Sequence, residues 1–249
     1  MSDFIVEAKG VTKVLGRGAA QVHALKDINL SLRGGELTVL MGPSGSGKTT
    51  LLSVLGCILT PTSGTVRVCG RATQGADAQA LAKLRRDHVG FVFQSYHLFP
   101  TLTAAENIQL ALDIRGVHGE DAREKSRDAL EKVGLVHKTA SYPHELSGGE
   151  QQRVAIARAI VSNPSAIFAD EPTAVLDTKN GQAIMSILAE IAKDPAHGVL
   201  VVTHDSRMTS FADRVIHIED GHLVRDELGI DSATKARTAA RAGQSAFGT

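Results

Sequence analysis

Residues 36–50 read "ELTVLMGPSGSGKTT", an apolar run that passes through a glycine-rich loop into a helix-like segment. From Gly42 to Thr49 the run matches G-x-x-x-x-G-K-[ST], in the strand–loop–helix context that this pattern requires. Glycines let backbone N–H groups close on phosphate oxygens, the Lys48 ammonium adds positive charge, and the Thr49 hydroxyl can ligate Mg²⁺. An ordinary glycine-rich turn is the alternative. The stretch predicts a phosphate-binding loop made of Gly42, Pro43, Ser44, Gly45, Ser46, Gly47, Lys48, Thr49 and Thr50.

Outward from this loop, apolar segments alternate with helix-like ones, which favours a largely parallel sheet with helices on both faces. A helix is expected directly after the loop, over residues 48–59, and residues 102–163 are interpreted as mostly helical. Strands are expected at residues 36–42, 65–70, 88–94, 165–170, 198–205 and 214–224, with a helix or turn at 206–213.

The predicted fold is α/β, with a P-loop (RecA-like) core, an antiparallel β edge sheet and an inserted α-helical subdomain. The edge sheet is expected from "FIVEAKGVTKVL" and "ALKDINLSLRGG", which alternate more regularly than the other strands. The core would comprise residues 1–94 and 165–228, and the helical subdomain residues 95–164. Residues 229–249 hold one Phe and one Ile and are expected to form a disordered tail.

Polar side chains follow three of the predicted strands. Asp170 is the last residue of "SAIFAD", and Glu171 comes directly after it. Gln94 ends "VGFVFQ", and His204 follows "VLVVT". In a parallel sheet these strand ends converge on the ligand. Asp170 and Gln94 are therefore expected to hold Mg²⁺ together with Thr49, and Glu171 to accept a proton from an attacking water. Taken singly, the Asp170-Glu171 pair would be interpreted as a solvated strand end and His204 as a structural histidine.

A second glycine loop, "LSGGEQQR" at residues 146–153, precedes another helix-like segment and could also cradle an anion. Because its helix belongs to the inserted subdomain, we expect that it cannot reach the nucleotide of its own chain. Two copies related by a twofold axis could each place Ser147, Gly148 and Gly149 on the nucleotide of the other. The sequence thus predicts one loop that holds the nucleotide and another that recognises it across a dimer interface.

Composition is that of an ordinary globular protein, with 43% hydrophobic and 22% charged residues. The formal net charge is zero, so bulk charge does not indicate a nucleic-acid partner. The two cysteines suit a reducing compartment. The opening "MSDFIVEAKG" is not typical of a signal peptide, and the longest apolar stretch, residues 51–59, is too short for a membrane span. We expect another chain to hold this one at any membrane.

The motifs together resemble the nucleotide-binding subunit of ABC transporters, over residues 4–226. "LSGGEQQR" is similar to the family's signature motif, Gln94 to its Q-loop glutamine, "VLD" at 175–177 to its D-loop and His204 to its switch histidine. Residues 51–66, 84–108 and 142–160 are most similar to the branch with the lipoprotein-releasing, macrolide-efflux and adaptor-linked glycolipid exporter ATPases.

The resemblance implies an ATP-hydrolysing motor that uses ATP and Mg²⁺, with Glu171 as catalytic base and Gln94 and His204 as further catalytic residues. It implies a homodimer at the cytoplasmic face of the inner membrane, bound to an integral membrane permease and, through it, to a periplasmic adaptor. The permease would select the cargo. The segment "SYHLFPTL" would dock the permease through Tyr96, Leu98, Phe99 and Leu102, which could equally be core residues.

Two positions depart from the family's pattern. Leu15 stands where the family usually stacks an aromatic ring on adenine, and residues 5–90 contain no Phe, Tyr or Trp. Val175 replaces the commoner alanine of the D-loop.

Two other functions compete with a transport motor. A soluble ABC ATPase acting on ribosomes would generally carry two cassettes, and one acting in DNA repair would carry a long coiled coil between Thr49 and Ser147. A cell-division-type scaffold that does not hydrolyse ATP is disfavoured by the presence of both Glu171 and His204.

Overall fold

Two sheets of different kinds share the helix that follows the phosphate loop. The computed structural model describes residues 4–229. Within them, a six-stranded sheet has the order β10-β9-β3-β8-β7-β6. Its strands are β3 (Glu36–Met41), β6 (Val89–Phe93), β7 (Ala166–Asp170), β8 (Gly198–Thr203), β9 (Arg214–Glu219) and β10 (His222–Leu228). All pairs are parallel except β9 with β10, which confirms the predicted parallel core.

The second sheet is antiparallel and has the order β2-β1-β4-β5 within the described chain. It is formed by β1 (Phe4–Leu15), β2 (Val22–Arg33), β4 (Ser63–Val68) and β5 (Arg71–Ala72), which confirms the predicted edge sheet. Helix α1 (Lys48–Leu55) packs between the two sheets, because Leu51 and Leu55 share one buried cluster with Ile28 of β2 and Phe168 of β7. The phosphate loop is therefore anchored to both sheets.

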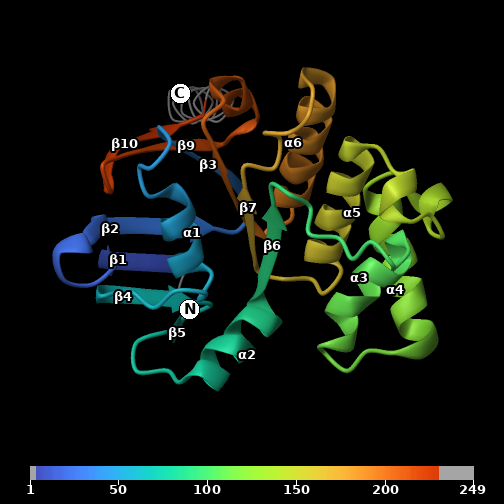
Figure 1. The fold of residues 1–249 in the computed structure, drawn as a ribbon, viewed down its shortest axis with the longest axis horizontal. Helices are drawn as coiled ribbons and strands as arrows, with labels where there is room; N and C mark the ends of the chain where they lie inside the picture. Colours follow the sequence, from blue (N-terminus) through green and yellow to red (C-terminus); the bar gives the residue numbers. More distant parts are fainter. Residues whose placement is uncertain (1–3, 230–249) are drawn as a thin grey trace, which may run out of the picture.

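The central strands are buried on both faces, as parallel strands between helices must be. Leu200 and Val202 of β8 face the α1 side, whereas Val199 and Val201 join a second cluster with α5 (Gly148–Ile160) and α6 (Thr178–Ala192). Helices α3 (Ala104–Asp113), α4 (Gly119–Lys132) and α5 gather on the side of β6 and β7 opposite to the antiparallel sheet (Figure 1). Short 3-10 helices lie at Gly18–Ala20, Val136–Lys138, Pro143–Glu145 and Ser206–Phe211.

Between β6 and β7 the described chain contains helices and loops and no strand. This arrangement agrees with the expected helical insertion, while the division at residues 95–164 stays a prediction.

The helix predicted over residues 48–59 was four residues too long. It ends at Leu55, with the Gly56 N–H donating to the Leu52 carbonyl at 2.9 Å and Cys57 in the left-handed region at φ 60°. A Cβ at Gly56 would lie 2.1 Å from the Phe91 ring, so the chain turns where it meets β6. The apolar residues 57–59 continued the pattern without continuing the helix.

The segment predicted as one strand at 214–224 is a hairpin of β9 and β10. Asp220 and Gly221 form its turn, both with positive φ (46° and 81°), as a two-residue hairpin turn requires.

Helix α2 (Ala78–His88) was missed by the sequence analysis, although Asp77 caps it by accepting from the Ala80 N–H at 2.7 Å. At the other end of the chain, Gly229 donates its N–H to the Asp213 carbonyl at 2.7 Å and is buried. The first residue of the tail predicted over 229–249 is thus part of the fold, and residues 230–249 lie outside the described residues.

Replacing Phe168 with alanine should lower the free energy of unfolding by about 3–5 kcal/mol, because the ring is fully buried between α1 and the central sheet. The matched change Phe99→Ala removes a ring that is 55% exposed and should cost about 0.5 kcal/mol. Urea unfolding of both variants measures the difference. Equal losses would contradict the assignment of Phe168 to the core that supports the phosphate loop.

Candidate active site

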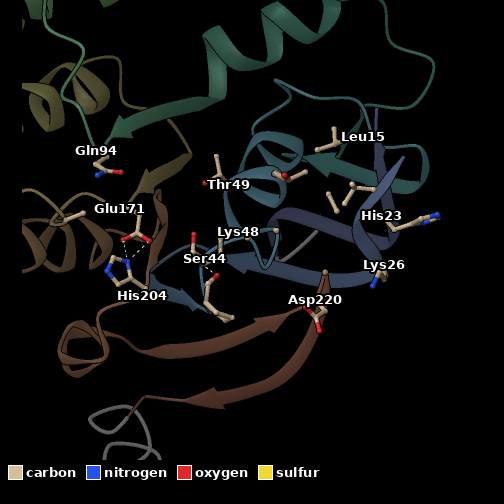
Figure 2. A pocket seen from close by; sticks show the side chains of 18 residues that line it. Leu15, His23, Lys26, Ser44, Lys48, Thr49, Gln94, Glu171, His204 and Asp220 are labelled. Carbon is tan, nitrogen blue, oxygen red and sulfur yellow. Dashed lines mark hydrogen bonds and ion pairs between the residues drawn. The ribbon is translucent and has the colours of Figure 1, made fainter. Parts of the chain in front are cut away.

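The carboxyl ends of the central strands open into a cavity of about 1020 Å³. At one end lie Lys48, Thr49, Gln94, Glu171 and His204, and at the other end lies a group from the antiparallel sheet, as Figure 2 shows. That second group consists of Leu15, Val22, His23, Ala24 and Lys26. The phosphate loop at one end, and the apolar side chains of Leu15 and Val22 at the other, suit a nucleotide lying along the cavity.

The phosphate loop keeps its shape through glycines that no other residue could replace cheaply. Gly47 has φ 104°, and a Cβ there would lie 2.5 Å from the Ala24 carbonyl oxygen. The Lys48 ammonium donates to the carbonyls of Gly42 and Pro43, both at 2.8 Å, which fixes its charge over the loop. The Ser46 Oγ is buried and has no hydrogen-bond partner within residues 4–229. The loop thus presents a fixed cation in a pocket shaped for an anion.

Thr49 and Asp170 bring two oxygen ligands together at the end of β7. The Thr49 hydroxyl donates to Asp170 Oδ1 at 3.2 Å. Burial raises the pKa of Asp170; the Thr49 hydrogen bond opposes this shift, while the neighbouring Glu171 charge adds to it. A divalent cation beside this carboxylate would offset the cost of keeping it charged.

Glu171 sits in a strained backbone conformation at the tip of β7. Its φ is 48°, in the left-handed region, and its N–H donates to the Val202 carbonyl at 2.9 Å. His204 Nδ1 lies 3.0 Å from both carboxylate oxygens of Glu171 (Figure 2). Glu171 is mostly buried whereas His204 is 65% exposed. The carboxylate is therefore aimed into the cavity and held there by an imidazole at its rim.

The second glycine loop lies apart from this cavity. Ser147 caps α5 in a capping box, in which its Oγ accepts from the Glu150 N–H at 3.3 Å and donates to Glu150 Oε2 at 2.8 Å. Hydrogen bonds from Ser147 hold the pKa of Glu150 below its usual range. Ser147, Gly148 and Gly149 are not among the residues that line the cavity. The described chain does not bring its two glycine loops onto one cavity.

Of the predicted site residues, the cavity gathers Pro43, Ser44, Gly45, Gly47, Lys48, Thr49, Thr50, Leu15, Gln94, Glu171 and His204. Gly42 and Ser46 belong to the loop and do not line the cavity. A Cβ at Gly42 would clash with the Ser46 Oγ and with the Ile218 carbonyl oxygen. Asp170 touches the site through Thr49.

Sequence reasoning missed several residues at the cavity wall, among them His23, Lys26 and Asp220. They carry no motif, and tertiary contacts bring them there. The Gly221 N–H donates to the Ser46 carbonyl at 3.0 Å, and the Lys26 N–H donates to the Gly221 carbonyl at 2.8 Å. The β9–β10 turn thus joins β2 to the phosphate loop.

This site defines the class: a phosphate-loop nucleotide-binding protein with an acid and a histidine beside the phosphate end. Residues 25–174 match the family described as ABC transporter. An uncharacterized ABC transporter ATP-binding protein of Methanocaldococcus jannaschii, MJ0796, is 43% identical over 227 residues, covering 90% of this chain and 97% of its own length. The chain belongs to the ABC transporter ATP-binding family, and its fold is that of an ABC ATPase cassette.

Other relatives are longer proteins. The macrolide export ATP-binding/permease protein MacB of Hahella chejuensis is 42% identical over 248 residues, which are 96% of this chain and 38% of MacB. The MacB protein of Escherichia coli is 43% identical over 227 residues, which cover 91% of this chain and 35% of MacB. The chain thus spans less than two fifths of the length of these MacB relatives.

Solved structures agree with the family assignment. The dimeric structure of a post-hydrolysis state of MJ0796, bound to ADP and Pi, superimposes with a TM-score of 0.82 at 42% identity. It covers 90% of this chain and 98% of that one. The structure of cbiO1 from Clostridium perfringens gives the same TM-score at 28% identity, covering 95% of this chain and 92% of that one.

Along residues 4–229, no helix combines the length and the apolar character that crossing a bilayer requires.

Replacing Leu15 with tyrosine should tighten ATP binding about two- to tenfold, because a stacked aromatic pair is worth about 0.5–1.5 kcal/mol beyond area burial. Leu15 is 37% exposed at the far end of the cavity and offers a base apolar contact without a ring face. The gain should be similar for ADP and smaller for CTP. Isothermal titration with the three nucleotides measures it, with Val136→Tyr as a control outside the cavity. Unchanged affinity for all three would mean that adenine rests elsewhere.

Proposed function

We propose that this ATPase is the motor subunit of an ABC transporter, which dimerises around two ATP molecules and drives a separate membrane permease. The observation that carries the proposal is the Glu171–His204 pair beside the phosphate loop, with His204 Nδ1 at 3.0 Å from both carboxylate oxygens. A carboxylate fixed at that place is what hydrolysis of a bound triphosphate needs from the protein.

In the proposed mechanism, the backbone of residues 42–49 and the Lys48 ammonium bind and orient the β- and γ-phosphates. Glu171 orients the attacking water and accepts its proton at a carboxylate oxygen. His204 holds that carboxylate in place and, at the exposed rim, is free to respond to the γ-phosphate. Gln94 directly follows the adjacent strand, β6, and would contact the γ-phosphate and its ion.

Mg²⁺ fits the residues present, because hard cations prefer oxygen ligands and Thr49 Oγ1 and Asp170 Oδ1 lie 3.2 Å apart. We propose that Thr49 holds it directly, with Asp170 and Gln94 completing the site. When bound, the ion would supply positive charge to the β- and γ-phosphate oxygens.

The proposed dimer uses the second glycine loop in trans. Ser147, Gly148 and Gly149 cap the start of α5, where backbone N–H groups and the helix dipole favour an anion. These residues do not line the cavity of their own chain, so they could complete the nucleotide site of a second copy instead. MJ0796 is dimeric in two solved structures, which supports a dimer here.

The permease is proposed from the MacB relatives, which are ATP-binding/permease proteins longer than this chain. Here the permease would be a separate chain that holds the ATPase at the cytoplasmic face of the inner membrane and selects the cargo. Export is proposed because these relatives are macrolide export proteins. Mechanical work on periplasmic parts and a periplasmic adaptor bound through the permease are proposed from the resemblance of the sequence motifs alone. We propose no nucleic-acid partner, in keeping with the zero net charge.

A non-hydrolysing scaffold, of the soluble or cell-division type, is the alternative. The contact between Glu171 and His204 favours turnover over a scaffold.

Replacing Glu171 with glutamine should keep ATP binding and lower turnover about 10²–10⁴-fold, because the amide cannot accept the proton. The variant should accumulate an ATP-bound dimer in size exclusion with Mg-ATP. Glu190→Gln, on the exposed face of α6, is the matched control and should hydrolyse ATP normally. Normal turnover in Glu171→Gln would assign the base to another residue.

Replacing Ser147 with arginine should leave nucleotide binding by the monomer intact and block ATP-dependent dimerisation. The bulky side chain would stand where the partner's phosphate approaches. Ser186→Arg, at an exposed position of α6, controls for the added charge. Light scattering with ATP measures the dimer, and a Ser147→Arg variant that still dimerises and hydrolyses ATP would refute the role in trans.

A further inference from the structure

A cavity of about 530 Å³ lies between the C-terminal ends of α4, α5 and α6, and none of its residues lines the nucleotide cavity. We call it the α5–α6 cavity. Cavities of about 300–1,000 Å³ with an apolar wall and a few polar groups are typical of small-molecule sites. Its lining consists of Lys132, Ile160, Asn163, Ser186, Ile187, Glu190, Ile191, Asp194 and His197.

Helices α5 and α6 contact each other closely at their starts and enclose the cavity at their other ends. A Cβ at Gly149, on α5, would lie 2.8 Å from Asn180 Oδ1, on α6. At the other end, Ile160 is the last residue of α5, and Ile187 and Ile191 lie one turn apart on α6. Ile160 belongs to the buried cluster of the helical side, and the other two isoleucines pack against it. The apolar wall of the cavity is thus continuous with the hydrophobic core.

This apolar wall is shielded from solvent. Ile160 is 8% exposed, whereas Ile187 and Ile191 are half-buried. No large apolar side chain that lines the cavity is among the exposed ones of the described chain. A protein partner would need an exposed apolar patch to dock on. The cavity therefore favours a small molecule over a protein segment.

The polar side of the cavity presents two hydrogen-bond acceptors that do not bond to each other. His197 is 8% exposed, and its Nδ1 lies 2.7 Å from the Pro164 carbonyl oxygen. Because a carbonyl only accepts, Nδ1 carries the proton, and Nε2 of the neutral ring is an acceptor. Nε2 lies 3.9 Å from Asp194 Oδ2, beyond hydrogen-bond length, and forms no hydrogen bond within residues 4–229. Asp194 Oδ1 accepts from the Ala196 N–H at 2.9 Å, which leaves Oδ2 for another donor.

We propose that the α5–α6 cavity binds a small molecule that has one protonated amine and an apolar body. An ammonium nitrogen about 2.9 Å from both Asp194 Oδ2 and His197 Nε2 would donate to each of them, and its charge would pair with the carboxylate. The apolar body would lie against Ile160, Ile187 and Ile191. Binding of this kind goes beyond the proposed function, because it needs neither ATP turnover nor a second copy.

The charges that line the cavity suit a single positive group. Glu190 pairs with the neighbouring Lys193 at 2.5 Å, so its charge is already partly balanced. Asp194 is 60% exposed and has no cation at ion-pair distance within the described chain, apart from the imidazole of His197 at 3.9 Å. Lys132 comes from α4 and would repel a second ammonium. A monoamine therefore fits the cavity better than a molecule with several positive charges.

The test titrates the full chain with three molecules that share one apolar body. They are 4-phenylbutylamine, 4-phenylbutanol and 4-phenylbutanoate, which end in an ammonium, a hydroxyl and a carboxylate. A ligand-observed NMR titration should give the amine an affinity about tenfold above that of the alcohol, because its hydrogen bonds are charge-assisted, with the carboxylate weakest. Saturating Mg-ADP should leave the affinity of the amine unchanged, since the two cavities share no residue.

Asp194→Asn should lower the affinity of the amine about tenfold and leave that of the alcohol within about twofold. The amide oxygen can still accept from the Ala196 N–H, so the turn is retained. Glu190→Gln, at an exposed position, should weaken the amine by a smaller factor and keeps the test valid if Asp194→Asn fails to fold. Asp121→Asn, in the exposed first turn of α4, is the matched control and should change no affinity.

Equal affinities for the three molecules, no binding of any of them, or an amine preference that survives both cavity variants would overturn the proposal. Displacement of the amine by Mg-ADP would place it in the nucleotide cavity and would also overturn the proposal. A preference for the carboxylate that Lys132→Gln abolishes would assign the cavity to anions instead. ATP hydrolysis measured on the same samples tests the proposed function separately, because absent turnover would leave the binding of the amine unchanged.

Discussion

The parallel register of β3, β8, β7 and β6 brings the residues at the phosphate end of the site together. It pairs Met41 with Thr203, Asp170 with Val202 and Phe93 with Asp170. The next residues along these strands are therefore Gly42, His204, Glu171 and Gln94, which come from four distant parts of the sequence. Burial of both sheet faces fixes this register, because a slip of one residue would exchange the α1 side with the α5–α6 side. The strand register that the core packing requires is thus the same register that places the site residues together.

Exposed apolar side chains mark the surfaces that a single chain leaves incomplete. Leu15 and Val22 lie at the base end of the nucleotide cavity, and Phe99 and Ile114 line a smaller cavity beside β6 and α3. Val175, 54% exposed in the D-loop segment, belongs to the proposed dimer interface. In the proposed assembly, the nucleotide and a second copy would each cover one of these surfaces.

Sequence alone predicted the parallel core, the edge sheet and the residues around the phosphate end. The strands are recognisable as local apolar runs, and the phosphate loop has a specific sequence pattern. It failed where tertiary contacts decide. The end of α1 depends on the Phe91 ring against Gly56. The β9–β10 hairpin, in contrast, has a local signal that was overlooked, because Asp-Gly between two apolar runs is typical of a two-residue hairpin turn. His23, Lys26 and Asp220 reach the cavity through hydrogen bonds between distant backbone groups, which no motif records. The roles of the site residues stay predictions.

A crystal structure of the Glu171→Gln variant with Mg-ATP would test the proposed dimer most directly. We expect two copies related by a twofold axis. Each ATP would lie between residues 42–49 of one copy and residues 147–149 of the other, with Gln94, residue 171 and His204 around the γ-phosphate. ATP enclosed by a single copy, or a dimer in which residues 147–149 face solvent, would contradict it.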